Sequence, residues 1–117
     1  MKSYTDIEQS RRLSEILPIE SADMWYQHIG YEHIADSEVP TYIPMVIRDC
    51  ESDVDIPCWT LSALLNVLNC PDLTQISDGR WYIRTWYLNR PYSVGGVGDP
   101  VDACVEMIIK LHELKML

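Results

Sequence analysis

The chain has 117 residues, 47% of them hydrophobic and 23% charged, and a formal net charge of −9 at pH 7. This size and composition predict one globular domain, 1–117, and exclude a disordered chain, because so much apolar surface can offset the entropy lost on ordering. The negative charge disfavours direct binding to nucleic acid and to anionic membranes. No apolar run reaches the roughly 20 residues that span a bilayer, and the N-terminal residues lack the apolar core of a secretory signal. We therefore expect a cytoplasmic protein without a membrane partner.

Two helices are predicted in the first third of the chain. Residues 5–17 carry aliphatic side chains at near-helical spacing, with Thr5 as a candidate N-cap and Pro18 as the stop. Residues 21–35, which read SADMWYQHIGYEHIA, predict a second helix. Its hydroxyl and carboxylate side chains stand where a helix begins, with Ser21 as the N-cap.

The middle of the chain predicts a short strand followed by a core helix. A polar segment at 36–41 leads to 42–47, where Pro44 would confine a strand to a sheet edge, because proline cannot donate to the ladder. The run IPCWTLSALLNVLN, residues 56–69, is apolar on most sides of a helix that Thr60 would cap. We therefore expect this helix to be the centre of the fold.

The last third predicts a hairpin and a final helix. Residues 72–77 and 80–88 are strand candidates, joined by an Asp-Gly pair that tolerates the positive φ angles of a tight turn. A glycine-rich connection follows, and then a helix over 99–116 that begins with Asp99 as cap and proline at its first position. Together the elements predict an α+β fold with about four helices packed around a small antiparallel sheet.

Three apolar stretches, in this order, resemble a family of short acidic proteins encoded in gut Bacteroidetes genomes and in their phages and mobile elements. The stretches are ADMWY at 22–26, IPCWTLSALLNVL at 56–68 and GDPVDACVEMIIKLHEL at 98–114. The resemblance implies a single small domain and a phage-related context. It implies no activity, cofactor or site residue.

Two groups of side chains are candidates for metal binding. The alternating acids could collect a hard cation such as Ca²⁺, but an EF-hand loop needs glycine and glutamate where this chain has Val54 and Thr60. Structural zinc sites use closely paired ligands, and the cysteines here are not so paired. The two groups are Asp49, Glu51, Asp53 and Asp55, and Cys50, Cys58, Cys70, Cys104, His28, His33 and His112. We expect a solvated acidic loop, reduced cysteines and no metal.

A glycine-rich run is a candidate for cofactor binding, and one cysteine is a candidate for nucleophilic catalysis. The run GGVGDP at 95–100 precedes a helix start, but Asp99 and Asp102 would occupy the anion site, and the lysine of a phosphate-binding loop is missing. Cys58 has no base near it in sequence, although His28, His33 or His112 could approach it in the fold. A cysteine next to a tryptophan is more typical of a residue packed in the core than of a nucleophile. The sequence predicts no catalytic residue and no cofactor.

The strand at 80–88 predicts a surface that mixes cations with aromatic rings. Because side chains alternate along a strand, four of them share one side: Arg80, Tyr82, Arg84 and Trp86. Two interpretations remain open. The side can be a partner-binding face, since arginine and aromatic residues are enriched at interfaces, or it can be covered by the last helix, with the arginines paired to the chain's own acids.

The leading hypothesis for function is a non-enzymatic protein-binding or adaptor protein in a phage or mobile-element context. It would act on an unidentified protein partner or through self-association. One alternative is an acidic mimic of DNA that inhibits a nucleic-acid enzyme, which would require carboxylates at phosphate-like spacing. The other is an enzyme whose site forms only in the fold.

Overall fold

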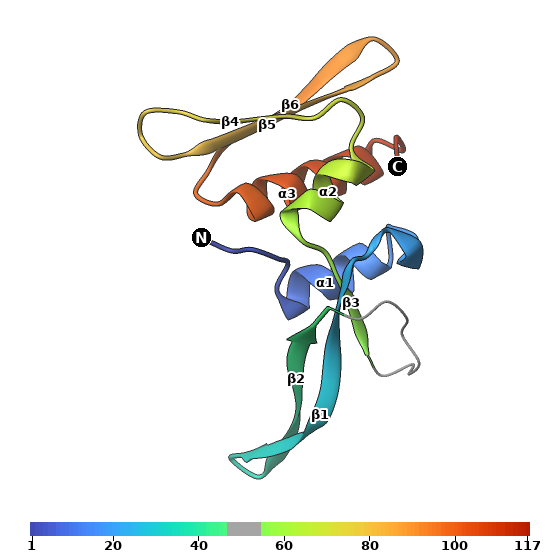
Figure 1. The fold of residues 1–117 in the computed structure, drawn as a ribbon, viewed down its shortest axis with the longest axis vertical. Coiled ribbons are helices and arrows are strands. Elements are labelled where there is room, and N and C mark those ends of the chain that lie inside the picture. The colour runs from blue at the N-terminus through green and yellow to red at the C-terminus, as the bar shows by residue number, and fades with distance from the viewer. Residues whose placement is uncertain (47–54) are drawn as a thin grey trace.

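A computed structural model describes residues 1–46 and 55–117. This part of the chain contains three α-helices, a short 3₁₀ helix and six strands (Figure 1). The helices are α1 (Ile7–Ser14), η1 (Ile19–Ser21), α2 (Leu61–Val67) and α3 (Pro100–Glu113), and the strands are β1 (Met24–Ile34), β2 (Ser37–Met45), β3 (Ile56–Cys58), β4 (Asp72–Gln75), β5 (Trp81–Tyr87) and β6 (Arg90–Val97). The strands form two antiparallel sheets, in the orders β2-β1-β3 and β4-β5-β6. The predicted α+β class is confirmed. The expected four helices around one sheet are corrected to three helices and two sheets.

The centre of the fold is α3, not the helix predicted from Thr60 onward within 56–69. Helix α3 lies directly beneath the β4-β5-β6 sheet, with α2 beside it and α1 below it, and eight of its residues are buried (Figure 1). In α2 only Ala63 and Leu64 are buried, because a helix of seven residues offers little surface to cover. Thr60 does cap α2 as predicted, since its hydroxyl accepts the backbone N–H of Ala63 at 3.2 Å.

Helix α1 is capped by Asp6, whereas the prediction was Thr5. The Asp6 carboxylate accepts the N–H of Gln9 at 2.8 Å, and the Gln9 side chain accepts the N–H of Asp6 in return. The hydroxyl of Thr5 is fully buried and is used inside the fold, where it lies 2.8 Å from Ser10 Oγ and accepts the N–H of Trp59 at 3.2 Å.

The helix predicted at 21–35 is wrong, because residues 24–34 form β1. The polar residues before it do not start a helix. Instead, the Asp23 carboxylate accepts the N–H of Thr60 at 2.9 Å and also its hydroxyl, so it holds the start of α2. Met24 to Tyr26 are buried between β2 and β3, and the Tyr26 hydroxyl donates to the carbonyl of Thr5 at 2.7 Å. Tertiary packing therefore decides the structure of this segment.

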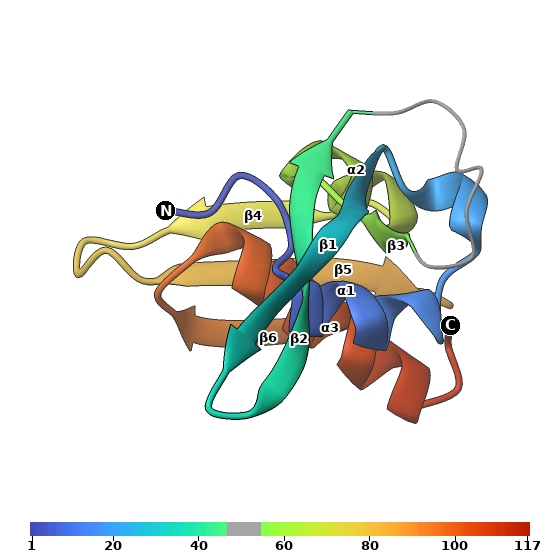
Figure 2. The same ribbon diagram turned by 90° about the horizontal axis from the view of Figure 1, so that it is seen from below.

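The polar segment at 36–41, expected only to lead to a strand at 42–47, is itself mostly strand, because residues 37–41 belong to β2. The turn between β1 and β2 consists of Ala35 and Asp36, with φ angles of 46° and 67°. Strand β2 lies at the edge of its sheet, as Pro44 predicted. Because β3 pairs only with residues 24–26 of β1, the rest of the β1-β2 hairpin projects from the body as a two-stranded arm (Figures 1 and 2). We call this hairpin the arm.

The second sheet confirms the predicted hairpin at Asp78 and Gly79, which joins β4 to β5. Its inner face packs on α3 through Ile83, which is 1% exposed. The glycine-rich segment after it is not a loose connection, because Gly95 and Gly96 belong to β6. Within residues 1–46 and 55–117, no helix is long and apolar enough to cross a membrane.

Candidate functional site

The outer face of the β4-β5-β6 sheet carries the four side chains predicted to share one side of β5. Tyr82 and Trp86 are 40% and 39% exposed, whereas Ile83 and Thr85 between them are buried. Strands β4 and β6 pair with the two edges of β5, and their register places residues of both strands next to these four side chains. We call Arg80, Tyr82, Arg84 and Trp86 the aromatic-arginine face.

Helix α3 does not cover the aromatic-arginine face. It packs on the opposite side of the sheet, against Ile83 (Figure 1). Of the two arginines, Arg80 lies 3.7 Å from the carboxylate of Asp78, and both side chains are more than half exposed. An ion pair of this kind contributes little to stability. No ion pair between described residues involves Arg84.

A shallow hollow of about 310 Å³ lies beside Arg84 on the outer face. Its lining residues come from all three strands: Asp72, Thr74, Ile76, Tyr82, Ile83, Arg84 and Ser93. Asp72 and Ser93 are the cross-strand neighbours of Arg84 on either side. The guanidinium carries five N–H donors in a fixed plane, which suits carboxylates and carbonyl oxygens of a partner.

Gly95 fixes the position of Tyr82. The aromatic ring lies so close to the backbone of Gly95 that a Cβ atom there would meet two ring carbons at 2.2 Å. The pairing of β5 with β6 shifts register between Trp81 and Ile83, at the position of Tyr82. A bulge of this kind changes the direction of the local side chain.

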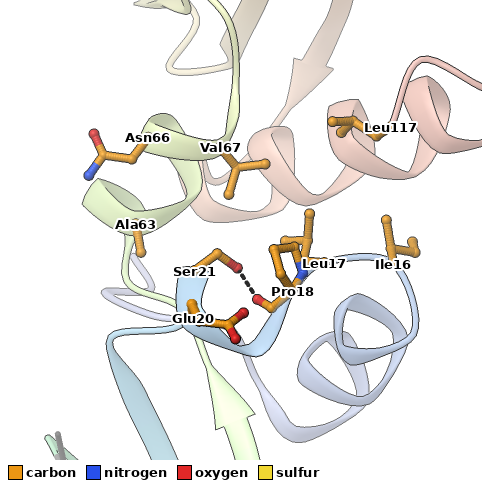
Figure 3. A pocket seen from close by; sticks show the side chains of 9 residues that line it. All are labelled: Ile16, Leu17, Pro18, Glu20, Ser21, Ala63, Asn66, Val67 and Leu117. Carbon is orange, nitrogen blue, oxygen red and sulfur yellow. Dashed lines mark hydrogen bonds between the residues drawn. The ribbon is translucent and has the colours of Figure 1, made fainter.

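A second candidate is a cleft of about 550 Å³ between η1, α2 and the last residue of the chain (Figure 3). Its lining is mostly apolar: Ile16, Leu17, Pro18, Glu20, Ser21, Ala63, Asn66, Val67 and Leu117. The hydroxyl of Ser21 donates to the carbonyl of Pro18 at 2.6 Å and accepts the indole N–H of Trp59 at 2.9 Å. Among the described residues that line the cleft, Glu20 is the only one with an ionisable side chain.

The thiol of Cys58 is buried among hydroxyl groups. It lies 3.6 Å from Thr5 Oγ1 and donates to the carbonyl of Thr5 at 3.4 Å. Burial raises its pKa, and burial likewise raises the pKa of Cys104 to about 12. Raised thiol pKa values oppose formation of the thiolate that a nucleophile needs. Cys58, Cys70 and Cys104 are all free.

The candidate zinc ligands do not converge in the described part of the chain. His28 packs against the rings of Tyr31 and Tyr42, and His33 lies 3.8 Å from the carboxylate of Glu38. His112 lies 3.1 Å from the carbonyl of Leu117. Across residues 1–46 and 55–117, no three His, Cys, Asp or Glu side chains are placed to hold a metal ion.

The acidic segment falls largely outside the described residues. Asp49, Cys50, Glu51 and Asp53 belong to residues 47–54. The carboxylate of Asp55 accepts the backbone N–H of His28 at 3.1 Å, which links β1 to the start of β3.

Carboxylates occupy the N-terminus of α3, as predicted. Asp99 caps the helix by accepting the N–H groups of Val101 and Asp102. Its second oxygen accepts the backbone N–H of Lys2 at 2.7 Å, and the Lys2 ammonium lies 2.8 Å from Asp102. The anion-binding capacity of this helix end is therefore used within the fold.

Sequence reasoning missed an apolar surface on the arm. Five aliphatic side chains are exposed there: Ile29, Ile34, Val39, Ile43 and Met45. The signal was present in β2, where Val39, Ile43 and Met45 stand two or four residues apart and therefore share a face. The sequence places Ile43 and Met45 in a predicted short edge strand and leaves Val39 in the polar segment before it, so the shared face was not recognised.

A comparison with protein-family models, with curated proteins and with solved structures gave no match to this chain. The aromatic-arginine face combines two exposed rings with a guanidinium, and the cleft in Figure 3 combines apolar walls with few polar groups.

Proposed function

We propose that the protein is a non-enzymatic protein-binding or adaptor protein that holds its partner on the aromatic-arginine face. The observation that carries this proposal is the exposure of Tyr82 and Trp86 on either side of Arg84, which has no ion pair among the described residues. Trp, Tyr and Arg are the residues that most often dominate the binding energy of protein interfaces. The proposal includes the phage or mobile-element context that the sequence resemblance implies.

The rigidity of β5 supports the same function. It is the central strand of its sheet, so both of its edges are hydrogen-bonded. The contact with Gly95 holds the ring of Tyr82 in place before any partner arrives. A surface that is already ordered loses less conformational entropy on binding.

The test is a double substitution, Arg84→Glu with Trp86→Ala, compared with wild type in partner capture from a host lysate and in sedimentation. Both side chains are exposed, so we expect the fold to survive and the captured partner or self-association to be lost. Arg12→Glu with Ile19→Ala makes the same charge reversal and also truncates an exposed apolar side chain, in α1 and η1, and should leave binding intact. Unchanged capture and an unchanged oligomeric state in the first variant would show that the face has no such role.

A further inference from the structure

The two ends of the molecule carry surfaces of opposite charge. The longest dimension of the molecule is 49 Å, with the β4-β5-β6 sheet at one end and the tip of the arm at the other (Figure 1). The aromatic-arginine face points away from α3 and from the arm. A second copy could therefore meet either end without meeting the other.

The tip of the arm is acidic and apolar. It carries the carboxylates of Glu32, Asp36 and Glu38, and no Lys or Arg occurs between Arg12 and Arg48. Ile34 and Val39 lie among these acids and are 54% and 41% exposed. The register pairs Glu32 with Val39 and Ile34 with Ser37, so a charged residue and two aliphatic residues share one face.

The sheet end has the complementary character. Three of the nine cationic residues of the chain lie on β5 and β6 or at their ends, namely Arg80, Arg84 and Arg90. Asp72 and Asp78 lie beside them and leave the local balance positive by one, in a chain whose net charge is −9. The hollow of about 310 Å³ beside Arg84 has an apolar wall in Tyr82 and Ile76, which suits an aliphatic side chain.

We propose that copies of this protein associate head to tail, with the acidic tip of one arm docked on the aromatic-arginine face of the next copy. Glu32, which shares a face with Ile34, pairs with Arg84, and Ile34 enters the hollow. This inference rests on the proposed function and names its partner as a second copy. Contact between two tips would bring acids together, and contact between two faces would bring arginines together. The charges therefore favour the unlike contact, which generates a ring or an open filament.

The experiment mixes two variants that each lose one end. The tip variant is Glu32→Lys with Ile34→Ser, and the face variant is Arg84→Glu with Trp86→Ala; all four residues are exposed. In low-salt buffer, mass photometry and light scattering should show wild-type oligomers that grow with concentration. Each variant alone should be monomeric. An equimolar mixture should give a 1:1 dimer and nothing larger, because only one intact tip and one intact face remain.

The opposing outcomes separate this inference from the proposed function. Wild type that stays monomeric at all concentrations overturns head-to-tail association, and loss of lysate capture in the face variant would then still support the proposed function. Variants that dimerise alone, or a mixture without a dimer, also overturn the inference. Circular dichroism of each variant checks that the fold is retained.

Discussion

The ring of Tyr82 lies directly over the backbone of Gly95, with no room between them for a methyl group. A Cβ atom at position 95 would approach two ring carbons to 2.2 Å. The first prediction is that Gly95→Ala pushes the ring outward and destabilises the protein by about 1–3 kcal/mol, as overpacking does elsewhere. Urea denaturation gives the free energy of unfolding. The displaced ring should also weaken binding at the aromatic-arginine face.

Two further variants show whether the ring is the cause. Gly98→Ala is the matched control, because a Cβ atom at position 98 has nothing within 4 Å, and it should be close to neutral. Adding Gly95→Ala to Tyr82→Ala should cost much less stability than Gly95→Ala alone, since the clashing ring is gone. Equal costs in both backgrounds would contradict this explanation.

The second prediction concerns the link between Asp23 and Thr60. Asp23 accepts both the N–H and the hydroxyl of Thr60, and the same hydroxyl caps α2 through Ala63. Asp23→Ala removes both acceptors and should lower the free energy of unfolding by about 1 kcal/mol. Thermal or urea unfolding measures the change.

Asp23→Asn keeps one acceptor oxygen, so it should lower the free energy of unfolding less than Asp23→Ala does. Glu20→Ala, an exposed acid three residues earlier, is the matched control for loss of a carboxylate. If Glu20→Ala destabilised the protein as much as Asp23→Ala, the loss would come from a general effect of removing negative charge. The hydrogen bonds between Asp23 and Thr60 would then not explain it.

The third prediction is a pH dependence that comes from Asp6. Burial raises the pKa of this carboxyl group, but the N–H of Gln9 and the ammonium of Lys2 outweigh burial, so the pKa lies below its ordinary value of 3.8. A lowered pKa in the folded state adds stability above the unfolded pKa, and this stability is lost as the pH falls through the folded pKa. Wild type should be more stable than Asp6→Asn at pH 7, and the difference should shrink below about pH 4.

Unfolding of both proteins between pH 7 and pH 3 tests this dependence. Asparagine still caps a helix, so the comparison isolates the charge. In a Lys2→Met background, Asp6→Asn should cost less at pH 7, because Lys2 Nζ lies 3.1 Å from the Asp6 carboxylate. A stability difference that stayed constant with pH would rule out the charge of Asp6 as its source.

The elements that the sequence predicted correctly have strong local signals. Strand β5 is dense in aromatic and β-branched residues and alternates between buried and exposed positions. Helix α3 begins with Asp99 and Pro100, a cap followed by the residue favoured at the first position. The same alternation predicted the aromatic-arginine face, because alternate residues of a single strand lie on the same side of the sheet.

The parts that the sequence did not reveal depend on contacts between distant segments. Strand β1 starts after Ser21 and Asp23, which resemble a helix start, but Asp23 bonds to Thr60 across the fold. The hollow beside Arg84 needs residues from three strands in register, and no single stretch encodes that register. Most of the arm touches no other element, so few of its positions are buried. Buried and exposed residues therefore do not alternate along most of the arm.

The anchoring of the N-terminal segment has a consequence for how the chain folds. The three hairpins, β1-β2, β4-β5 and β5-β6, join strands that are neighbours in sequence, so they can form early. Lys2, in contrast, bonds to Asp99 and Asp102, nearly 100 residues later. During synthesis α1 emerges before α3, so its contacts with α3 must wait until residues 100–113 have been made. The apolar side of α1 is therefore the surface that most needs protection while the chain is incomplete.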